Sequence, residues 1–190
     1  MEKRRRTALF KISILFLLFA AAVALITAVS YRSMLKAFYP LRQTELVERY
    51  AAENGLDEAL VYAVIKTESD FKPGAVSAAN AKGLMQLTLP TFQWLQTKTG
   101  EQLSSDALFD EETNVRYGTL FLRLLQEEFG STQEVLAAYH AGRGQVNRWL
   151  EDPGVSSDGK TLDHIPIPET AHYVKKVTKA IHRYHNLYHI

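Results

Sequence analysis

The chain has 190 residues, which is enough for one globular domain with a short appendage. Residues 1–11 hold five basic groups against one acidic group, whereas the remaining 17 basic and 20 acidic residues leave the rest of the chain mildly acidic, which argues against a nucleic-acid-binding protein. The absence of cysteine excludes disulfides, thiol catalysis and zinc sites with cysteine ligands.

The first predicted element is a membrane span. Residues 12–31 contain no charge, and as a helix they would be about 30 Å long, enough to cross the hydrocarbon core of a bilayer. The basic cluster of residues 1–11 should stay on the cytoplasmic side, which places the chain after Arg32 outside the cytoplasm. We therefore expect a single-pass protein of the cell membrane, with a cytoplasmic basic segment, an anchor and an extracytoplasmic domain.

A cleaved signal peptide is the alternative for this segment, because the small residues at 20–22 and 22–24 resemble cleavage sites. We favour an uncleaved anchor, since the apolar run continues past both sites without a break. A buried helix of a soluble protein fits less well, because the run is apolar on every side. Residues 32–40 should form a short connector, in which Tyr39-Pro40 ends any helix.

From residue 41 onward, helical patterns alternate with loops, and we expect residues 41–190 to form one domain. Its first helix should cover residues 43–54 and stop at Gly55, where glycine suits a helix end. Asp57 should cap a second helix that runs to about Ser69 and is terminated by Pro73-Gly74. Residues 74–82 form a loop of small residues, and short helices are predicted around residues 84–87 and 91–96.

A long helix is predicted from Asp110 to Phe129. Its expected core side consists of Val115, Leu120, Phe121, Leu124 and Leu125. Ser131 and Glu134 resemble a capping box, so the next helix should run to about Gly142, with a short helix over residues 145–150 after it.

The last part of the chain holds a loop and a final helix. Residues 151–164 are polar and contain glycine and serine, which is typical of a mobile surface loop. Pro168 suits the first turn of a last helix that reaches about Tyr188. Because no segment shows strand alternation, the predicted fold class is mainly α, with little or no sheet.

Glu68 is the first candidate for chemistry. It continues the apolar face of its predicted helix, which consists of Leu60, Val61, Val64 and Ile65. Desolvation and the negative end of the helix dipole should both raise its pKa, so the carboxyl group could act as a general acid. The alternative is a solvent-facing glutamate, or one paired with Lys66 or Lys72. No second carboxylate lies at a suggestive local spacing, since Asp70 falls on another side of the helix.

Three further segments carry candidate side chains. Gln86 is polar within an apolar run, and its amide could bind sugar hydroxyls or acetamido groups, or simply cap local backbone. Tyr139 follows two alanines and offers a ring and a hydroxyl, or is a core tyrosine. Glu169 and Tyr173 lie four residues apart on one helix face, where they can meet; otherwise they are an acid at a helix N-terminus and a buried tyrosine.

Taken together and in this order, these segments resemble the lytic transglycosylase family with the soluble-transglycosylase catalytic domain. The resemblance covers about residues 41–188. Its motifs are Glu68-Ser69-x-Phe71, Gly83-Leu84-Met85-Gln86, Ala138-Tyr139-x-Ala141-Gly142, and the block from Ile165 to Val174 with the pattern Ile-Pro-x-x-Glu-Thr-x-x-Tyr-Val.

The resemblance implies a lysozyme-like, mainly helical catalytic domain over residues 41–190, similar to goose-type lysozyme. It implies cleavage of the β-1,4 bond between N-acetylmuramic acid and N-acetylglucosamine in peptidoglycan, with Glu68 as the single acid and base. The muramoyl C6 hydroxyl would attack C1 and close a 1,6-anhydro ring, so that no second carboxylate is needed. The positions that match substrate-binding residues of the family are Ser77, Met85, Gln86, Tyr139, Glu169 and Tyr173.

The expected partners are peptidoglycan glycan strands and, through the N-terminal helix, the cytoplasmic membrane; an anchored enzyme could also join a cell-envelope complex. We expect no cofactor, no metal and no nucleic acid. His182, His185 and His189 are spaced for a shared helix face, but they more simply face solvent near a helix C-terminus.

The chain departs from the family pattern at several positions. His140 replaces the usual asparagine, Arg143 the usual proline and Ile167 the usual phenylalanine, and Pro90 comes one position late. These changes leave the acid in place and affect its surroundings.

Two other functions compete with this one. A hydrolytic muramidase on the same scaffold would need a carboxylate or a positioned water opposite Glu68. Residues 151–164 hold acids that could serve, namely Glu151, Asp152, Asp158 and Asp163. A non-catalytic glycan-binding or scaffolding module of an envelope complex is the second alternative, against which the intact Glu68 argues.

Overall fold

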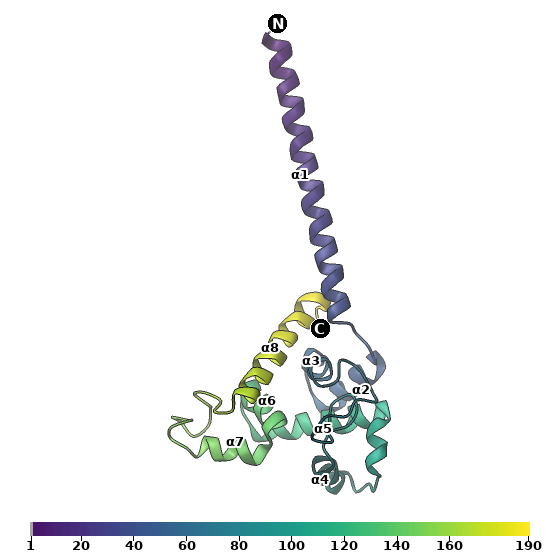
Figure 1. Ribbon diagram of the computed structural model, residues 1–190, viewed down its shortest axis with the longest axis vertical. Helices are drawn as coiled ribbons and strands as arrows, with labels where there is room; N and C mark the ends of the chain where they lie inside the picture. Colours follow the sequence, from purple (N-terminus) through teal and green to yellow (C-terminus); the bar gives the residue numbers. More distant parts are fainter. Residues whose placement is uncertain (1) are drawn as a thin grey trace. The chain divides into compact units, whose positions relative to one another are not determined.

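The computed structural model describes residues 2–190, with side chains from residue 14 onward. The chain divides after Pro40 into an N-terminal unit and a larger unit of residues 41–190. The described residues form α-helices and one short 3-10 helix, and they contain no strand (Figure 1). The mainly α fold class predicted from the sequence is therefore confirmed.

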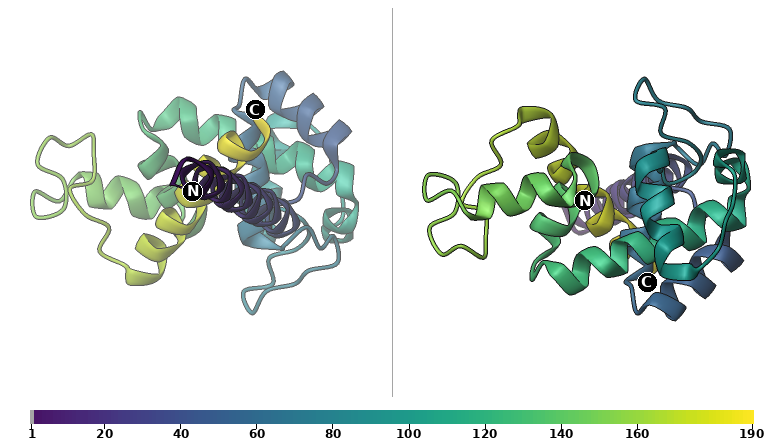
Figure 2. Two further views of the ribbon diagram at one scale, coloured as in Figure 1. Left: turned by 90° about the horizontal axis from the view of Figure 1, so that it is seen from above. Right: turned by 90° about the horizontal axis from the view of Figure 1, so that it is seen from below.

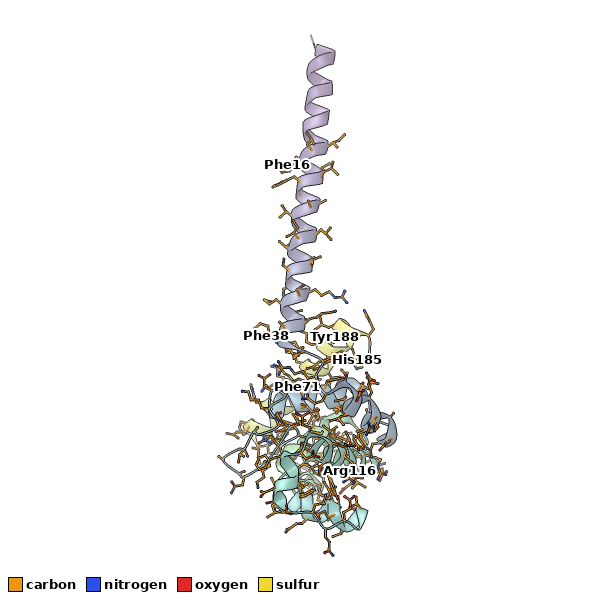
Figure 3. The ribbon with its side chains drawn as sticks, turned by 90° about the vertical axis from the view of Figure 1, so that its right-hand side faces the viewer. Phe16, Phe38, Phe71, Arg116, His185 and Tyr188 are labelled. Atoms are coloured by element: carbon orange, nitrogen blue, oxygen red, sulfur yellow. The ribbon has the colours of Figure 1, made fainter. Side chains whose placement is uncertain are left out.

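The N-terminal unit is one helix, α1 (Glu2–Phe38). From residue 14 its large apolar side chains are exposed on all sides, as Phe16 and Phe38 illustrate in Figure 3. By length and composition, residues 14–38 could cross a membrane. The helix continues through residues 32–38, which the sequence predicted as connector, because nothing before Tyr39-Pro40 interrupts it.

The larger unit begins with α2 (Thr44–Asn54) and α3 (Glu58–Glu68). Gly55 adopts φ 62°, and the carboxylate of Asp57 accepts a hydrogen bond from the backbone N–H of Ala59 at 2.9 Å, so the predicted stop and cap are both confirmed. Residues 59–65 of α3 are all buried. This helix is therefore the centre of the domain core rather than a surface helix with one apolar face.

The helix α3 ends at Glu68, within one residue of the predicted end at about Ser69 and before Pro73-Gly74. Asp70 and Phe71 adopt φ values of 54° and 60°, which turn the chain sharply just after Glu68. Residues 72–88 then form a loop with two isolated antiparallel bridges, Val76 to Lys82 and Lys82 to Leu87. The sharp turn leaves Glu68 on the last turn of α3, next to this loop.

The short helix predicted at residues 84–87 is wrong: residues 83–86 form a turn, and Leu87 forms a bridge with Lys82. Gly83 has φ 80° and Gln86 has φ 49°, and backbone in the left-handed region cannot continue a right-handed helix. The apolar side chains that suggested a helix are buried for another reason, because the loop packs directly onto the domain core.

The middle of the domain consists of α4 (Leu89–Thr99), the 3-10 helix η1 (Ser105–Phe109) and α5 (Glu111–Glu128). Asp110 caps α5 as predicted, since its carboxylate accepts from the backbone N–H of Thr113 at 2.8 Å. Helix α4 is longer than the predicted segment at both ends. On α5, Val115, Phe121 and Leu125 are buried as expected, whereas Leu120 and Leu124 are only half-buried.

The last helices are α6 (Thr132–Ala141), α7 (Arg143–Leu150) and α8 (Pro168–Tyr188). The predicted capping box is only half right. The hydroxyl of Ser131 accepts from the N–H of Gln133, but Glu134 is buried and accepts from the backbone N–H of Leu162 at 2.9 Å. Helix α8 packs against both α3 and α6.

The segment of residues 151–164 is a surface loop at one end of the domain, beside α7 (Figures 1 and 2). Most of its residues are exposed, but Val155 and Leu162 are buried. With the hydrogen bond from Leu162 to Glu134, these contacts attach both halves of the loop to the domain.

Candidate active site

Glu68 occupies the last turn of α3 and is half-buried. Desolvation raises the pKa of its carboxyl group from 4.5 to about 7, against smaller lowering effects of the Tyr173 phenol and the Lys176 charge. The raised pKa that the sequence predicted is therefore confirmed, with desolvation as its largest cause. A carboxyl group with this pKa exists in both protonation states near neutral pH, which suits proton transfer in either direction.

Tyr173, from the first half of α8, is the polar side chain that faces Glu68. Its hydroxyl is buried and makes no hydrogen bond of ordinary geometry with the described residues. It is nevertheless close enough to the carboxyl group to lower the pKa of Glu68, and the carboxylate in turn contributes to the raised pKa of the phenol. A buried donor aimed at one carboxyl group stabilises that group's charged form.

Tyr139, near the end of α6, is a second phenol close to the acid. Its hydroxyl donates to the backbone carbonyl of Met85 at 2.7 Å, and its ring lies 5.1 Å from that of Phe121. Burial and the charge of Glu68 both raise its pKa. Three helices, α3, α6 and α8, thus bring one carboxyl group and two phenols together.

The loop that carries Met85 is held by Asn114, a fully buried residue of α5 that was not among the candidate site residues predicted from the sequence. Its amide donates to the carbonyls of Lys82 and Leu108, at 2.9 and 2.8 Å, and its oxygen accepts from the N–H of Met85 at 2.7 Å. The sequence feature that could have identified Asn114 is its position as a polar residue in line with the apolar face of a long helix. A second tie comes from Ser69, whose hydroxyl donates to the carbonyl of Leu84 at 2.7 Å.

Three of the predicted substrate-binding residues lie in or beside this loop, in different settings. The amide nitrogen of Gln86 donates to the carbonyls of Ala75 and Gly83, at 3.1 and 2.9 Å, so only its oxygen remains to accept from a ligand. Ser77 is exposed, and its hydroxyl accepts from the N–H of Ala81 at 3.1 Å.

Met85 does not present its side chain to a cleft. It is fully buried, and a Cβ atom built at Gly118 would lie 2.2 Å from its sulfur, so the thioether fills the space that the missing side chain of Gly118 leaves. Its backbone carbonyl, as the acceptor for Tyr139, is the part that bears on the site.

Glu169 is exposed in the first turn of α8, and its charge acts on His140 rather than on Glu68. The imidazole of His140 lies against the ring of Tyr173, with ring centroids 4.5 Å apart. The ring of Tyr173 and the charge of Glu169, four residues apart on α8, therefore both act on His140.

Three of the other acids considered as partners of Glu68 serve local structure. Asp158 accepts from the backbone N–H groups of Lys160 and Thr161, both at 2.7 Å, and Asp163 accepts from the N–H of Ser157 at 2.9 Å. Asp70 forms an ion pair with Lys66. Within the part of the chain whose side chains are described, no second carboxylate contributes to the electrostatic environment of Glu68.

Of the C-terminal histidines, His182 and His189 are exposed, and His185 makes a local contact. The Nε2 atom of His185 lies 3.0 Å from a carboxylate oxygen of Asp57, the residue that caps α3. Among residues 14–190, no group of three histidine or acidic side chains is arranged to hold a metal ion.

The raised pKa of Glu68 predicts a pH-dependent stability. The folded protein holds this proton up to about pH 7, whereas the unfolded chain releases it near pH 4.5. The free energy of unfolding should therefore fall as the pH rises through that range, by up to about 3 kcal/mol. Glu68→Gln should lack this decrease. Between about pH 4 and pH 8, the free energy of unfolding of the variant, measured in urea, should therefore rise relative to that of the parent by about 3 kcal/mol. An equal stability difference at both pH values would contradict the buried carboxyl group.

Known lytic transglycosylases are similar to this chain along most of residues 41–190. Residues 45–161 match the family model described as "Transglycosylase SLT domain". The soluble lytic murein transglycosylase of Escherichia coli K12 is 32% identical in an alignment of 147 residues that covers 73% of this chain and 22% of that protein. The membrane-bound lytic murein transglycosylase C of Serratia proteamaculans is 34% identical over 161 residues, covering 71% of this chain and 44% of that protein. The chain thus spans less than half the length of these relatives.

Solved structures show the same fold. An inactive glutamate-to-glutamine mutant of the lytic transglycosylase Slt from Pseudomonas aeruginosa superposes with a TM-score of 0.70 at 30% identity, over 80% of this chain and 25% of that chain. The 70 kDa soluble lytic transglycosylase of Escherichia coli gives a TM-score of 0.71 at 28% identity, over the same shares. The lysozyme-like helical architecture expected from the sequence is confirmed.

Proposed function

This chain belongs to the transglycosylase SLT domain family, and from that premise we propose that it is a membrane-anchored lytic transglycosylase that cleaves the glycan strands of peptidoglycan. The observation that carries the proposal is the setting of Glu68, a desolvated carboxyl group beside the phenols of Tyr139 and Tyr173 and without a carboxylate partner among the described residues. One acid that both gives and accepts a proton is what a non-hydrolytic cleavage requires of the protein.

In the first step, the protonated Glu68 gives its proton to the glycosidic oxygen between N-acetylmuramic acid and N-acetylglucosamine. The bond from C1 to that oxygen then breaks, and positive charge develops at C1 of the muramoyl sugar. A pKa of about 7 keeps a substantial fraction of Glu68 protonated at neutral pH, which an exposed glutamate could not achieve.

In the second step, the Glu68 carboxylate takes the proton from the C6 hydroxyl of the same muramoyl sugar, and O6 attacks C1. This closes a 1,6-anhydro ring and returns the proton to Glu68, so that no water is consumed. The nucleophile comes from the substrate, which explains how one carboxyl group can suffice where glycosidases ordinarily use two.

The surrounding residues have supporting roles in this proposal. The Tyr173 hydroxyl stabilises the carboxylate between the two steps, and Tyr139 fixes the loop of residues 82–87 through the Met85 carbonyl. The free oxygen of Gln86, the hydroxyl of Ser77 and the carboxylate of Glu169 are the groups we assign to substrate contact.

The products of digestion test this function. The full chain in detergent should release from purified peptidoglycan fragments that end in 1,6-anhydro-muramoyl groups, lighter by one water than hydrolytic fragments. Because no water enters the proposed product, digestion in ¹⁸O-labelled water should leave these ends unlabelled. Labelled reducing ends would show a hydrolytic muramidase instead, and binding without release would show a glycan-binding module.

We further propose that residues 14–38 anchor the protein in the cytoplasmic membrane with residues 41–190 outside. Length, composition and the similarity to a membrane-bound relative support this placement. Since the chain has no cysteine, single introduced cysteines can report topology.

The two informative positions are Gln126, which is exposed on α5, and Thr7 in the basic segment. Gln126→Cys should react with a membrane-impermeant thiol reagent on intact spheroplasts, and Thr7→Cys should react only after lysis. Protection of the first cysteine would contradict the orientation, and release of the labelled domain into the medium would indicate a cleaved signal peptide.

A further inference from the structure

His140 occupies the last turn of α6 and packs against the ring of Tyr173 on α8. The two ring centroids are 4.5 Å apart, with an angle of 32° between the ring planes. The Nδ1 atom of His140 lies 3.1 Å from the hydroxyl oxygen of Thr170, a residue of α8 that is only 1% exposed. The imidazole is therefore held in place by one ring contact and one hydrogen bond, both to the helix that carries Tyr173.

Tyr173 connects His140 with the acid. Its ring contacts the imidazole, while its buried hydroxyl faces Glu68 and has no other polar partner among the described residues. The three side chains thus run from the surface, where His140 is exposed, to the half-buried carboxyl group.

We propose that His140 is a positioning residue that holds the Tyr173 phenol against Glu68 and that, when protonated, slows the reaction in mild acid. This inference rests on the proposed function, because it assigns Glu68 the double role described above.

The charge on the imidazole would act through the phenol. An imidazolium against the face of the Tyr173 ring makes the hydroxyl a stronger hydrogen-bond donor to Glu68 and adds a positive charge nearby. Both effects stabilise the carboxylate, and a stabilised carboxylate is a poorer base for the C6 hydroxyl in the ring-closing step. Protonation of His140 therefore lowers the rate without removing any group that touches substrate.

The groups around His140 determine the pH at which its imidazole becomes charged. On α8, Glu169 favours the imidazolium and Thr170 can accept a hydrogen bond from it, while burial against Tyr173 disfavours it and is the larger effect. The pKa of His140 is consequently below its usual 6.5, so the ring is neutral at pH 7 and becomes charged only at lower pH. The remaining charged or titratable groups interact around the hydroxyl of Tyr173 and the carboxyl group of Glu68. They are Glu68 itself on α3, Lys176 on α8 and Tyr139 on α6.

Two substitutions separate the positioning role from the titration. His140→Phe keeps a ring against Tyr173 but cannot be protonated, and His140→Asn keeps a polar group near Thr170 but removes the ring contact. His172→Phe is the matched control, because this exposed histidine of α8 has no ring contact with Tyr173 among the described residues.

The readout is kcat/KM for release of anhydro-muropeptides by the full chain between about pH 4.5 and pH 8. We expect the ratio of activity at pH 5 to activity at pH 7 to be about fivefold higher in His140→Phe than in the parent or in His172→Phe. His140→Asn should lose about tenfold in kcat across the range while its thermal unfolding midpoint changes little, because Tyr173 is no longer held. Superimposable profiles of His140→Phe and the parent would overturn the titration role, and an unchanged kcat in His140→Asn would overturn the positioning role.

A second measurement does not depend on activity. In an NMR titration of the full chain, with the His140 signal identified by its loss in His140→Phe, Tyr173→Ala should raise the titration midpoint of His140 toward 6.5, because the ring that covers the imidazole is removed. An unchanged midpoint would overturn the contact between His140 and Tyr173 even if the enzyme is active. A raised midpoint, together with a parent chain that releases no anhydro product, would support the contact while refuting the proposed function.

Discussion

Glu68→Gln should reduce the release of anhydro-muropeptides by at least about a thousandfold. Glutamine has nearly the same shape as glutamate but can neither give a proton to the glycosidic oxygen nor take one from the C6 hydroxyl. Both proposed steps use this one group, so the variant loses two proton transfers at once. The rate of soluble fragment release from purified peptidoglycan, followed by mass spectrometry, measures the loss.

The variant should fold, because a neutral amide is easier to bury than a carboxylate. Its thermal unfolding midpoint at neutral pH should equal or exceed that of the parent. Glu53→Gln, an exposed position on the neighbouring helix α2, is the matched control and should keep full activity. Substantial cleavage by a well-folded Glu68→Gln would mean that another group is the acid.

Gly83→Ala should destabilise the domain by about 3 kcal/mol or more. Gly83 has φ +80°, a conformation that costs energy for any residue with a side chain. An added Cβ would also lie 2.1 Å from the amide nitrogen of Asn114 and 2.2 Å from the backbone carbonyl oxygen of Leu108. The methyl group would therefore disturb the buried amide that fastens residues 82–85 to α5, and a backbone atom cannot move aside cheaply.

Gly74→Ala is the control for this substitution. Gly74 lies in the same loop, but an added Cβ there meets nothing within 4 Å and its φ is not positive. Its free energy of unfolding, measured in urea, should stay within about 1 kcal/mol of the parent. If the two alanine variants were equally stable, the close contact between Gly83 and Asn114 would be refuted.

Most helices could be predicted from the sequence because their signals are local. Asp57 and Asp110 cap helices through hydrogen bonds to residues two or three positions away, and Gly55 ends α2 in a conformation that glycine adopts freely. Residues 84–87 were misread as a helix because the turn they form depends on Asn114, about thirty residues further along the chain. An apolar run indicates that its residues are buried, but it does not indicate which part of the protein covers them.

The sequence by itself determined that a carboxyl group ends the central helix on its apolar side. That follows from helical periodicity alone, and desolvation then raises the pKa of Glu68 as expected. Only the tertiary structure decided what surrounds that acid, because Tyr139, Tyr173 and His140 come from α6 and α8 and reach it through packing between helices. Local propensity has no information on such contacts. The family resemblance placed Met85 among the substrate-binding positions, whereas its side chain is buried against Gly118.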